Sequence, residues 1–249
     1  MKSSYYKYFA ALLLFGSNGI VASNINLPSY EIVLLRLLLG SLFLITVFTV
    51  SRQRFTFYRN KHTCLYLFIS ASAMGASWML LYEAYQQVGI SIASLAYYCG
   101  PVIVMILSPF LFRETLTWPK IAGFLTVLAG MCLVNLQALD EGKTIWGLFC
   151  GLMSAFMYAL MVTANKKAKP ESGLENSLLQ LVIGSFIVVA FVSMQKNFVL
   201  SLTTIDWIPV LLLGLLNTGI GCYLYFSSIT DLPVQTVAIC GYLEPLSAV

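Results

Sequence analysis

The chain has 249 residues, of which 59% are hydrophobic and 10% are charged. Soluble domains average about 45–50% and 25% respectively, so this composition excludes a water-soluble globular fold and indicates an all-α polytopic membrane protein. The net charge of +4 arises from 14 basic and 10 acidic residues, and their distribution matters more than their sum. The first apolar run lacks a cleavage site, so we interpret it as a membrane-spanning helix and not as a signal peptide.

Nine apolar runs follow one another along the chain. A helix rises 1.5 Å per residue, so about 20 apolar residues cross a hydrocarbon core of roughly 30 Å. Short connections between the runs are typical of a compact helical bundle. The predicted spans are residues 7–25, 30–50, 63–86, 91–111, 119–138, 144–165, 175–194, 206–228 and 233–249.

The basic residues are distributed unevenly between the loops. If the N-terminus is cytoplasmic and each run crosses once, eleven of the fourteen basic residues lie in cytoplasmic segments, and only Lys143 and Lys196 lie in outer loops. Cytoplasmic loops are enriched in Lys and Arg, so we expect a cytoplasmic N-terminus, with a bacterial plasma membrane as the expected location. The eleven residues are Lys2, Lys7, Arg52, Arg54, Arg59, Lys61, Arg113, Lys120, Lys166, Lys167 and Lys169.

The sequence resembles itself at a single offset of 144 residues. This offset relates the second, third and fourth runs to the seventh, eighth and ninth, so the repeated unit has five helices. Because five is odd, the second unit enters the membrane from the opposite side, as in the inverted repeats of secondary transporters. We predict two repeats, residues 1–143 and 144–249. Matched pairs include Glu31 with Glu175, Gly40 with Gly184, Gly75 with Gly219, Tyr98 with Tyr242 and Pro101 with Pro245.

The second unit has no counterpart of the run at 119–138 within the sequence. At the same offset the counterpart falls at about 263–282, beyond Val249. We therefore expect a ten-helix protein, of which this sequence carries nine helices and lacks helix 10. A longer reading frame would confirm this expectation.

Two stretches carry a family resemblance. Residues 97–134, YYCGPVIVMILSPFLFRETLTWPKIAGFLTVLAGMCLV, combine a proline within a span, a loop glutamate and a glycine-containing next span, and residues 242–249, YLEPLSAV, repeat the beginning of this pattern. Both resemble the drug/metabolite transporter superfamily, and within it the EamA-type ten-helix transporters. The resemblance implies a bundle with a central cavity that moves small metabolites, often outward.

Three ionisable residues fall within predicted spans, away from the first and last two residues of each: Arg36, Glu83 and Glu244. Such residues are costly in a bilayer and are candidate functional groups. Arg36 either holds a substrate carboxylate or pairs with Glu31 near the outer interface. Glu83 either binds an amine or a proton, or is an interfacial carboxylate. Glu244 is the strongest candidate because it precedes Pro245, and a proline break is tolerated where a helix faces a cavity; buried structural pairing is the alternative.

Pro101 marks the matching break in the first unit, and Tyr97, four residues earlier, is predicted to share its helix face. Aromatic side chains near these breaks either line a cavity and attract cations or anchor helices at the interface. Asn18 either binds substrate or hydrogen-bonds between helices, whereas we interpret Asn217 as structural. The aromatic candidates are Trp78, Tyr82, Tyr97, Tyr98, Tyr158, Tyr223 and Tyr242.

Other features have structural interpretations. Glu114 is expected to cap the helix that begins near Pro119, with a role in an inner gate as the alternative. The stripe of Gly147, Gly151, Ala155 and Ala159 marks a helix-packing face, more consistent with packing within the chain than with a partner chain. The six cysteines are interpreted as packing residues, and no metal or cofactor is expected.

The leading hypothesis is a secondary transporter of small metabolites such as amino acids, working by alternating access between the repeats, with proton coupling through Glu83 or Glu244. There is no P-loop, so ATP is not expected to drive it directly. An intramembrane enzyme is disfavoured because the sole histidine, His62, lies in a loop. The alternative is a non-transporting membrane sensor or assembly protein. The expected partners are a small-molecule substrate, a proton, the lipid bilayer and a second copy as a homodimer, but no nucleic acid.

Overall fold

The computed structural model describes residues 2–119, 121–123, 125, 126, 129, 145–194 and 207–247. These residues are helical with short connections and contain no strand. Six helical segments among them are long and apolar enough to cross a membrane. The predicted all-α polytopic fold is therefore confirmed. Most of the run at 119–138 lies outside the described residues, as do Lys143, Lys196 and the predicted boundary between the repeats.

Every other predicted run coincides with helix, although several runs are divided into shorter pieces. The elements are α1 (Lys2–Gly16), α2 (Asn18–Ala22), α3 (Ser29–Val50), η1 (Phe57–Arg59), α4 (Lys61–Val88), α5 (Ile90–Tyr97), α6 (Cys99–Phe112), α8 (Ile145–Ala168), α9 (Gly173–Ser193), α10 (Trp207–Leu211), the π-helix η4 (Leu212–Ile220), α11 (Gly221–Ile229), α12 (Val234–Cys240) and α13 (Leu243–Ser247).

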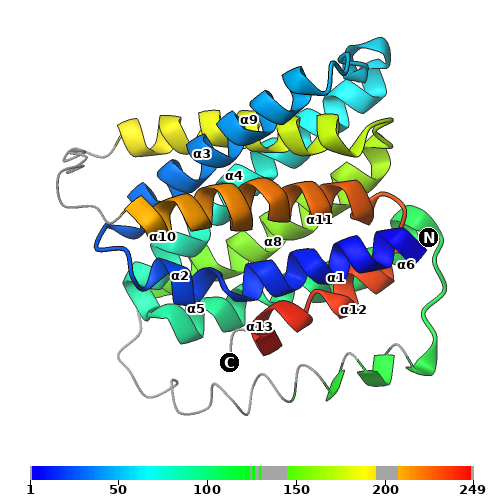
Figure 1. Cartoon of the computed structure of the whole chain (residues 1–249). Coiled ribbons are helices and arrows are strands. Elements are labelled where there is room, and N and C mark those ends of the chain that lie inside the picture. Colours follow the sequence, from blue (N-terminus) through cyan, green and yellow to red (C-terminus); the bar gives the residue numbers. More distant parts are fainter. Residues whose placement is uncertain are drawn as a thin grey trace.

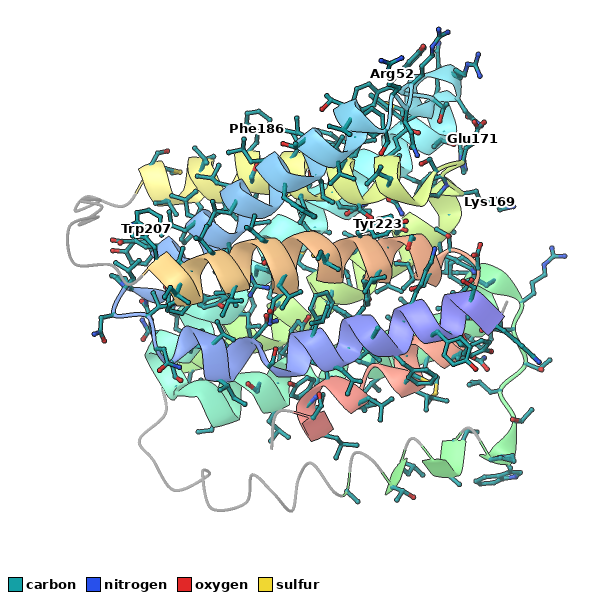
Figure 2. The ribbon with its side chains drawn as sticks, in the orientation of Figure 1. Arg52, Lys169, Glu171, Phe186, Trp207 and Tyr223 are labelled. Atoms are coloured by element: carbon teal, nitrogen blue, oxygen red, sulfur yellow. The ribbon has the colours of Figure 1, made fainter. Side chains whose placement is uncertain are left out.

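The helices run back and forth between the two ends of one bundle (Figure 1). The N-terminus and the α3–α4, α8–α9 and α11–α12 connections lie at one end, which we call the N-terminal end. The α2–α3 and α4–α5 connections lie at the opposite end. Arg52 and Lys169 lie at the N-terminal end and Trp207 lies at the opposite end (Figure 2). The predicted basic loops therefore gather at a single end of the molecule.

Helix contacts occur in pairs related by the repeat. Helix α4 packs against α8 and α9, and its counterpart in the second half, η4–α11, packs against α1 and α3. Helix α6 packs against α8, and α13 packs against α1 in the same way. Helix α3 packs against its own counterpart α9, and α6 of the fourth span packs against α12 of the ninth, which is the span equivalent to the fourth. This pattern is that of an inverted repeat whose pseudo-twofold axis passes between α3 and α9 and between the fourth and ninth spans.

Both predicted helix breaks occur, but each begins before its proline. The fourth span changes from α5 to α6 at Tyr98, three residues before Pro101, and the ninth is interrupted at Gly241 and Tyr242, before Pro245. A proline ring clashes with the carbonyl of the residue four positions earlier, so the distortion falls in the preceding turn. The prediction that Tyr97 and Pro101 share a helix face is therefore wrong, because the break lies between them.

Two irregularities were not predicted. The first span breaks at Ser17, between α1 and α2, and the eighth span contains the π-helix η4. The two features meet at Asn217, whose amide donates to the Leu14 carbonyl (2.8 Å), to Ser17 Oγ (2.9 Å) and to Asn18 Oδ1 (3.0 Å). Asn217 thus satisfies polar groups that the break in the first span leaves free, and its structural interpretation is confirmed.

Small residues bring the central helices together. A Cβ built on Gly151 of α8 would lie 2.8 Å from the Cβ of Ala96 in α5. Ser77 of α4 and Ser154 of α8 bond to each other's backbone carbonyls at 2.9 and 2.7 Å. The small-residue stripe of α8 therefore packs within the chain, as predicted. Other large apolar side chains point outward, as Phe186 of α9 does with 69% of its surface exposed (Figure 2), which suits a lipid-facing surface.

Candidate functional site

A cavity of about 570 Å³ lies between the two halves of the bundle. Its walls come from α1 to α5 of the first half and from α8, α11 and α13 of the second. The volume falls within the range of about 300–1,000 Å³ typical of small-molecule sites. Eight of the eleven predicted site residues line it: Asn18, Arg36, Trp78, Tyr82, Tyr97, Tyr98, Tyr158 and Glu244.

Arg36 is held in a fixed orientation on one wall. Its Nε donates to Thr218 Oγ1 at 2.9 Å, and its guanidinium carbon lies 4.6 Å from the ring centroid of Trp78. Only 5% of the Arg36 surface is exposed. Among the described residues no ion pair joins Arg36 to Glu31, whose Oε2 is buried without a hydrogen-bond partner. The suggested Arg36–Glu31 pair is therefore wrong, and the guanidinium edge remains available to the cavity.

Glu244 supplies the opposite charge from the second half. It lies in the first turn of α13, directly after the break in the ninth span, and lines the same cavity as Arg36. Gly16 of α1 permits this position, since a Cβ on Gly16 would lie 2.9 Å from the Glu244 carbonyl oxygen. One cation and one carboxylate, from different halves, thus share an aromatic-walled cavity.

Tyrosines form the inner limit of the cavity towards the N-terminal end. The hydroxyls of Tyr158 and Tyr225 are 3.3 Å apart, and the rings of Tyr97 and Tyr158 meet edge to face at 5.5 Å. Behind them Tyr8, fully buried, packs against Tyr225 and donates from its hydroxyl to the Val237 carbonyl at 2.8 Å. This tyrosine layer separates the cavity from α12.

Sequence reasoning missed several lining aromatics, among them Tyr85 and Tyr225. Tyr225 follows the lining residue Cys222 by three positions, a helical spacing that places both on one face. Tyr223, which was suggested instead, contacts Lys7, with the Lys7 Nζ 5.8 Å from its ring centroid. Because the sequence alone does not mark Cys222 as a lining residue, the helical period could not by itself identify Tyr225.

Three predicted site residues do not line the cavity. Glu83 Oε1 accepts from Gln87 Nε2 at 3.1 Å and from Trp146 Nε1 at 3.3 Å, outside the cavity wall. Pro101 is buried within α6. Tyr242 is 1% exposed and donates from its hydroxyl to the Tyr98 carbonyl at 2.9 Å. Pro101 and Tyr242 shape the breaks beside the cavity, whereas Glu83 belongs to the α4–α8 contact.

The cavity reaches solvent at the end opposite the N-terminus. Ser23, beyond α2, and Gln86, near the end of α4, are both exposed and line its mouth. At the N-terminal end, the described lining residues include none from the connection that follows α6 or from the α11–α12 connection. Among the described residues, the lining therefore reaches the surface at the end opposite the N-terminus and not at the N-terminal end.

Comparison with known proteins places this geometry in a family. The family model described as "EamA-like transporter family" matches residues 3–136 and 145–249. The chain is 26% identical to "Uncharacterized transporter YxxF" of Bacillus subtilis, over 98% of this chain and 78% of that protein. It is 22% identical to "Biotin transporter" of Salmonella typhimurium, over 74% of this chain and 62% of that protein. A solved crystal structure shares the fold with a TM-score of 0.79 and 18% identity, over 99% of this chain and 86% of the other. Since the family model matches both halves, the chain belongs to the EamA-like transporter family.

Proposed function

We propose that the chain carries a small amphipathic metabolite with a carboxylate group, such as an amino acid, by alternating access of the cavity between its halves. Family membership makes it a membrane transporter and not an enzyme, and disfavours the sensor or assembly alternative. The observation that carries the proposal is that Arg36 and Glu244, from opposite halves, line one cavity.

The charges and the aromatic walls suit different parts of such a substrate. A guanidinium binds a carboxylate through two parallel hydrogen bonds, and the contacts of Arg36 with Thr218 and Trp78 leave it oriented for this role. Glu244 suits an ammonium group, and the tyrosine and tryptophan rings suit an apolar body or a cation. Biotin, named in some relatives, also carries a carboxylate, which supports the assignment of Arg36.

Alternating access requires two conformations, in which the cavity is open at opposite ends of the bundle. The conformation described here is open at the end opposite the N-terminus. Because the basic residues gather at the N-terminal end (Figure 2), we assign that end to the cytoplasm, so this conformation faces outward. The plasma membrane location and the homodimer stay predictions.

Glu244 is the proposed proton carrier, in preference to Glu83. Only Glu244 shares the cavity with the substrate, so its carboxylate can exchange a proton for an ammonium group at the same place. An imposed pH gradient should then drive uptake by the unmodified protein. The uptake that remains in Glu244→Gln should no longer respond to this gradient.

Uptake in proteoliposomes tests the proposal. A panel of radiolabelled amino acids and other small carboxylates is offered to the unmodified protein, to Arg36→Gln and to Glu244→Gln. We expect saturable uptake of at least one zwitterion, reduced about tenfold or more by each substitution, since a lost charge-assisted bond is worth about 1.5–3 kcal/mol. Glu171→Gln, an exposed carboxylate far from the cavity lining, is the matched control. Uptake that neither cavity substitution alters would disprove the binding mode, and no uptake of any carboxylate would disprove the substrate class.

A further inference from the structure

At the closed end of the cavity, a carboxylate of the first half accepts hydrogen bonds from the backbone of the second half. Glu114, in the connection after α6, accepts hydrogen bonds from the backbone N–H groups of Val234 (2.7 Å) and Gln235 (3.0 Å). These are the first residues of α12, whose N-terminal N–H groups have no partner within the helix. The expectation that Glu114 caps the helix beginning near Pro119 is therefore wrong: it caps a helix of the second half.

A second contact joins the same two elements. Pro109 has no N–H, so the Met105 carbonyl lacks its usual helical partner, and Ser108 Oγ donates to it at 3.0 Å. The Gln235 amide in turn donates to Ser108 Oγ at 2.8 Å and to the Glu114 carbonyl at 3.4 Å. The site in α6 where Pro109 removes one backbone hydrogen bond is thus coupled by hydrogen bonds to the first turn of α12.

The rest of the α11–α12 connection is held from other directions. Lys166 of α8 donates from its ammonium group to the Thr230 carbonyl at 2.6 Å and to that of Leu232. Ser4 of α1 donates to Asp231 Oδ2 at 2.9 Å. The Lys166 contacts stay within the second half, whereas those of Ser4 and Glu114 join the two halves.

We propose that Glu114 is the latch of the closed end: its carboxylate must leave the α12 N-terminus before the cavity can open towards the N-terminal end. This inference rests on the alternating access proposed above. The cavity is open opposite the latch, and the tyrosine layer and α12 lie between the cavity and Glu114. For the cavity to open at this end, α12 must part from α1 and α6, and the Glu114 carboxylate is the charged group that ties α12 to the first half at its N-terminus.

The latch predicts reciprocal changes at the two ends of the cavity. In the full chain with its six cysteines replaced by alanine, one reporter cysteine replaces Ala238, buried in α12 at the closed end, or Ser94, which lines the cavity near the open end. Labelling by a hydrophilic maleimide is followed in detergent solution. Glu114→Ala should speed labelling of Ala238→Cys about tenfold and slow labelling of Ser94→Cys in parallel.

Glu114→Gln keeps the shape and one acceptor oxygen, so its effects should be intermediate, and Glu171→Ala, which removes an exposed loop carboxylate at the same end, should change neither rate. Local fraying of α12 would speed Ala238→Cys without slowing Ser94→Cys. Any result in which Ser94→Cys labelling does not fall overturns the latch. The labelling needs no substrate, so a failed latch remains distinguishable from a protein that transports no carboxylate.

Discussion

The hydroxyl of Tyr242 donates to the backbone carbonyl of Tyr98 at 2.9 Å, and the two residues are separated by the 144-residue offset of the repeat. Equivalent residues of the two halves therefore touch each other, each at the break of its own span. The contact ties the α5–α6 break to the α12–α13 break beside the cavity. A polar group at a helix break, which would otherwise face a dry interior, obtains its partner from the other half.

Removing this hydroxyl should destabilise the fold without changing its shape. Tyr242→Phe leaves a buried carbonyl at Tyr98 without this donor, so we expect the free energy of unfolding to fall by about 1 kcal/mol. SDS titration in mixed micelles measures the change. Tyr223→Phe is the control, because the Tyr223 ring contacts Lys7 on the outside of the cavity. Equal stability of the two variants would contradict the structural role of the contact.

Arg36→Lys tests whether the cavity needs a planar guanidinium or only a positive charge. A lysine cannot donate to Thr218 while presenting two parallel donors to a carboxylate, and it is more strongly hydrated. We expect the KM for the transported carboxylate to rise about tenfold, which corresponds to about 1.4 kcal/mol, with a smaller effect on the maximal rate. A KM equal to that of the unmodified protein would show that Arg36 acts only as a point charge.

Glu83→Gln tests whether Glu83 binds substrate or a proton, as the sequence suggested, or only takes part in the α4–α8 contact. Glu83 bonds to Gln87 and Trp146 outside the cavity, so we expect substrate KM and proton-driven uptake to remain within about twofold of the unmodified protein. Uptake assays at two values of pH provide the measurement. Loss of proton-driven uptake in Glu83→Gln, with Glu244→Gln unaffected, would reverse the assignment of the proton carrier.

Gly75→Ala tests the close packing of α4 on α9. The added Cβ would lie 2.8 Å from the backbone oxygen of Gly184, an atom that cannot move aside as a side chain can. We expect a loss of about 1–3 kcal/mol in unfolding free energy, measured by the same SDS titration. Gly19→Ala meets nothing within 4 Å and should be neutral or slightly stabilising.

The repeat and the composition were enough to predict the fold class, the breaks in the fourth and ninth spans and eight of the residues that line the cavity. Tyr98 and Tyr242 could be recognised as equivalent from the offset alone. Their contact could not be predicted, because the offset does not say where the pseudo-twofold axis passes. The axis lies between the fourth and ninth spans, and this position brings the equivalent residues together.

Glu83 shows a different limit to predicting the site from the sequence. Hydropathy gives the depth of a residue along a span but not its direction around the helix. Trp78 and Tyr82 are four residues apart and line the cavity together. Glu83 follows Tyr82 by about 100° around the axis, since a turn contains 3.6 residues, and so it faces Trp146. Glu114 shows the same limit at longer range, because its partners lie 120 and 121 residues away.

At the N-terminal end, each half also supplies a carboxylate that accepts hydrogen bonds from backbone N–H groups of the other half. Glu114 of the first half caps α12 of the second, while Glu175 of the second half accepts from the N–H groups of Thr56 (2.6 Å) and Phe57 (2.9 Å) in the first. During synthesis the first half is complete before either set of hydrogen bonds can form, so its carboxylate and its loop amides must rely on water and headgroups until the second half is inserted. The N-terminal end can therefore reach the arrangement described here only after both halves are inserted.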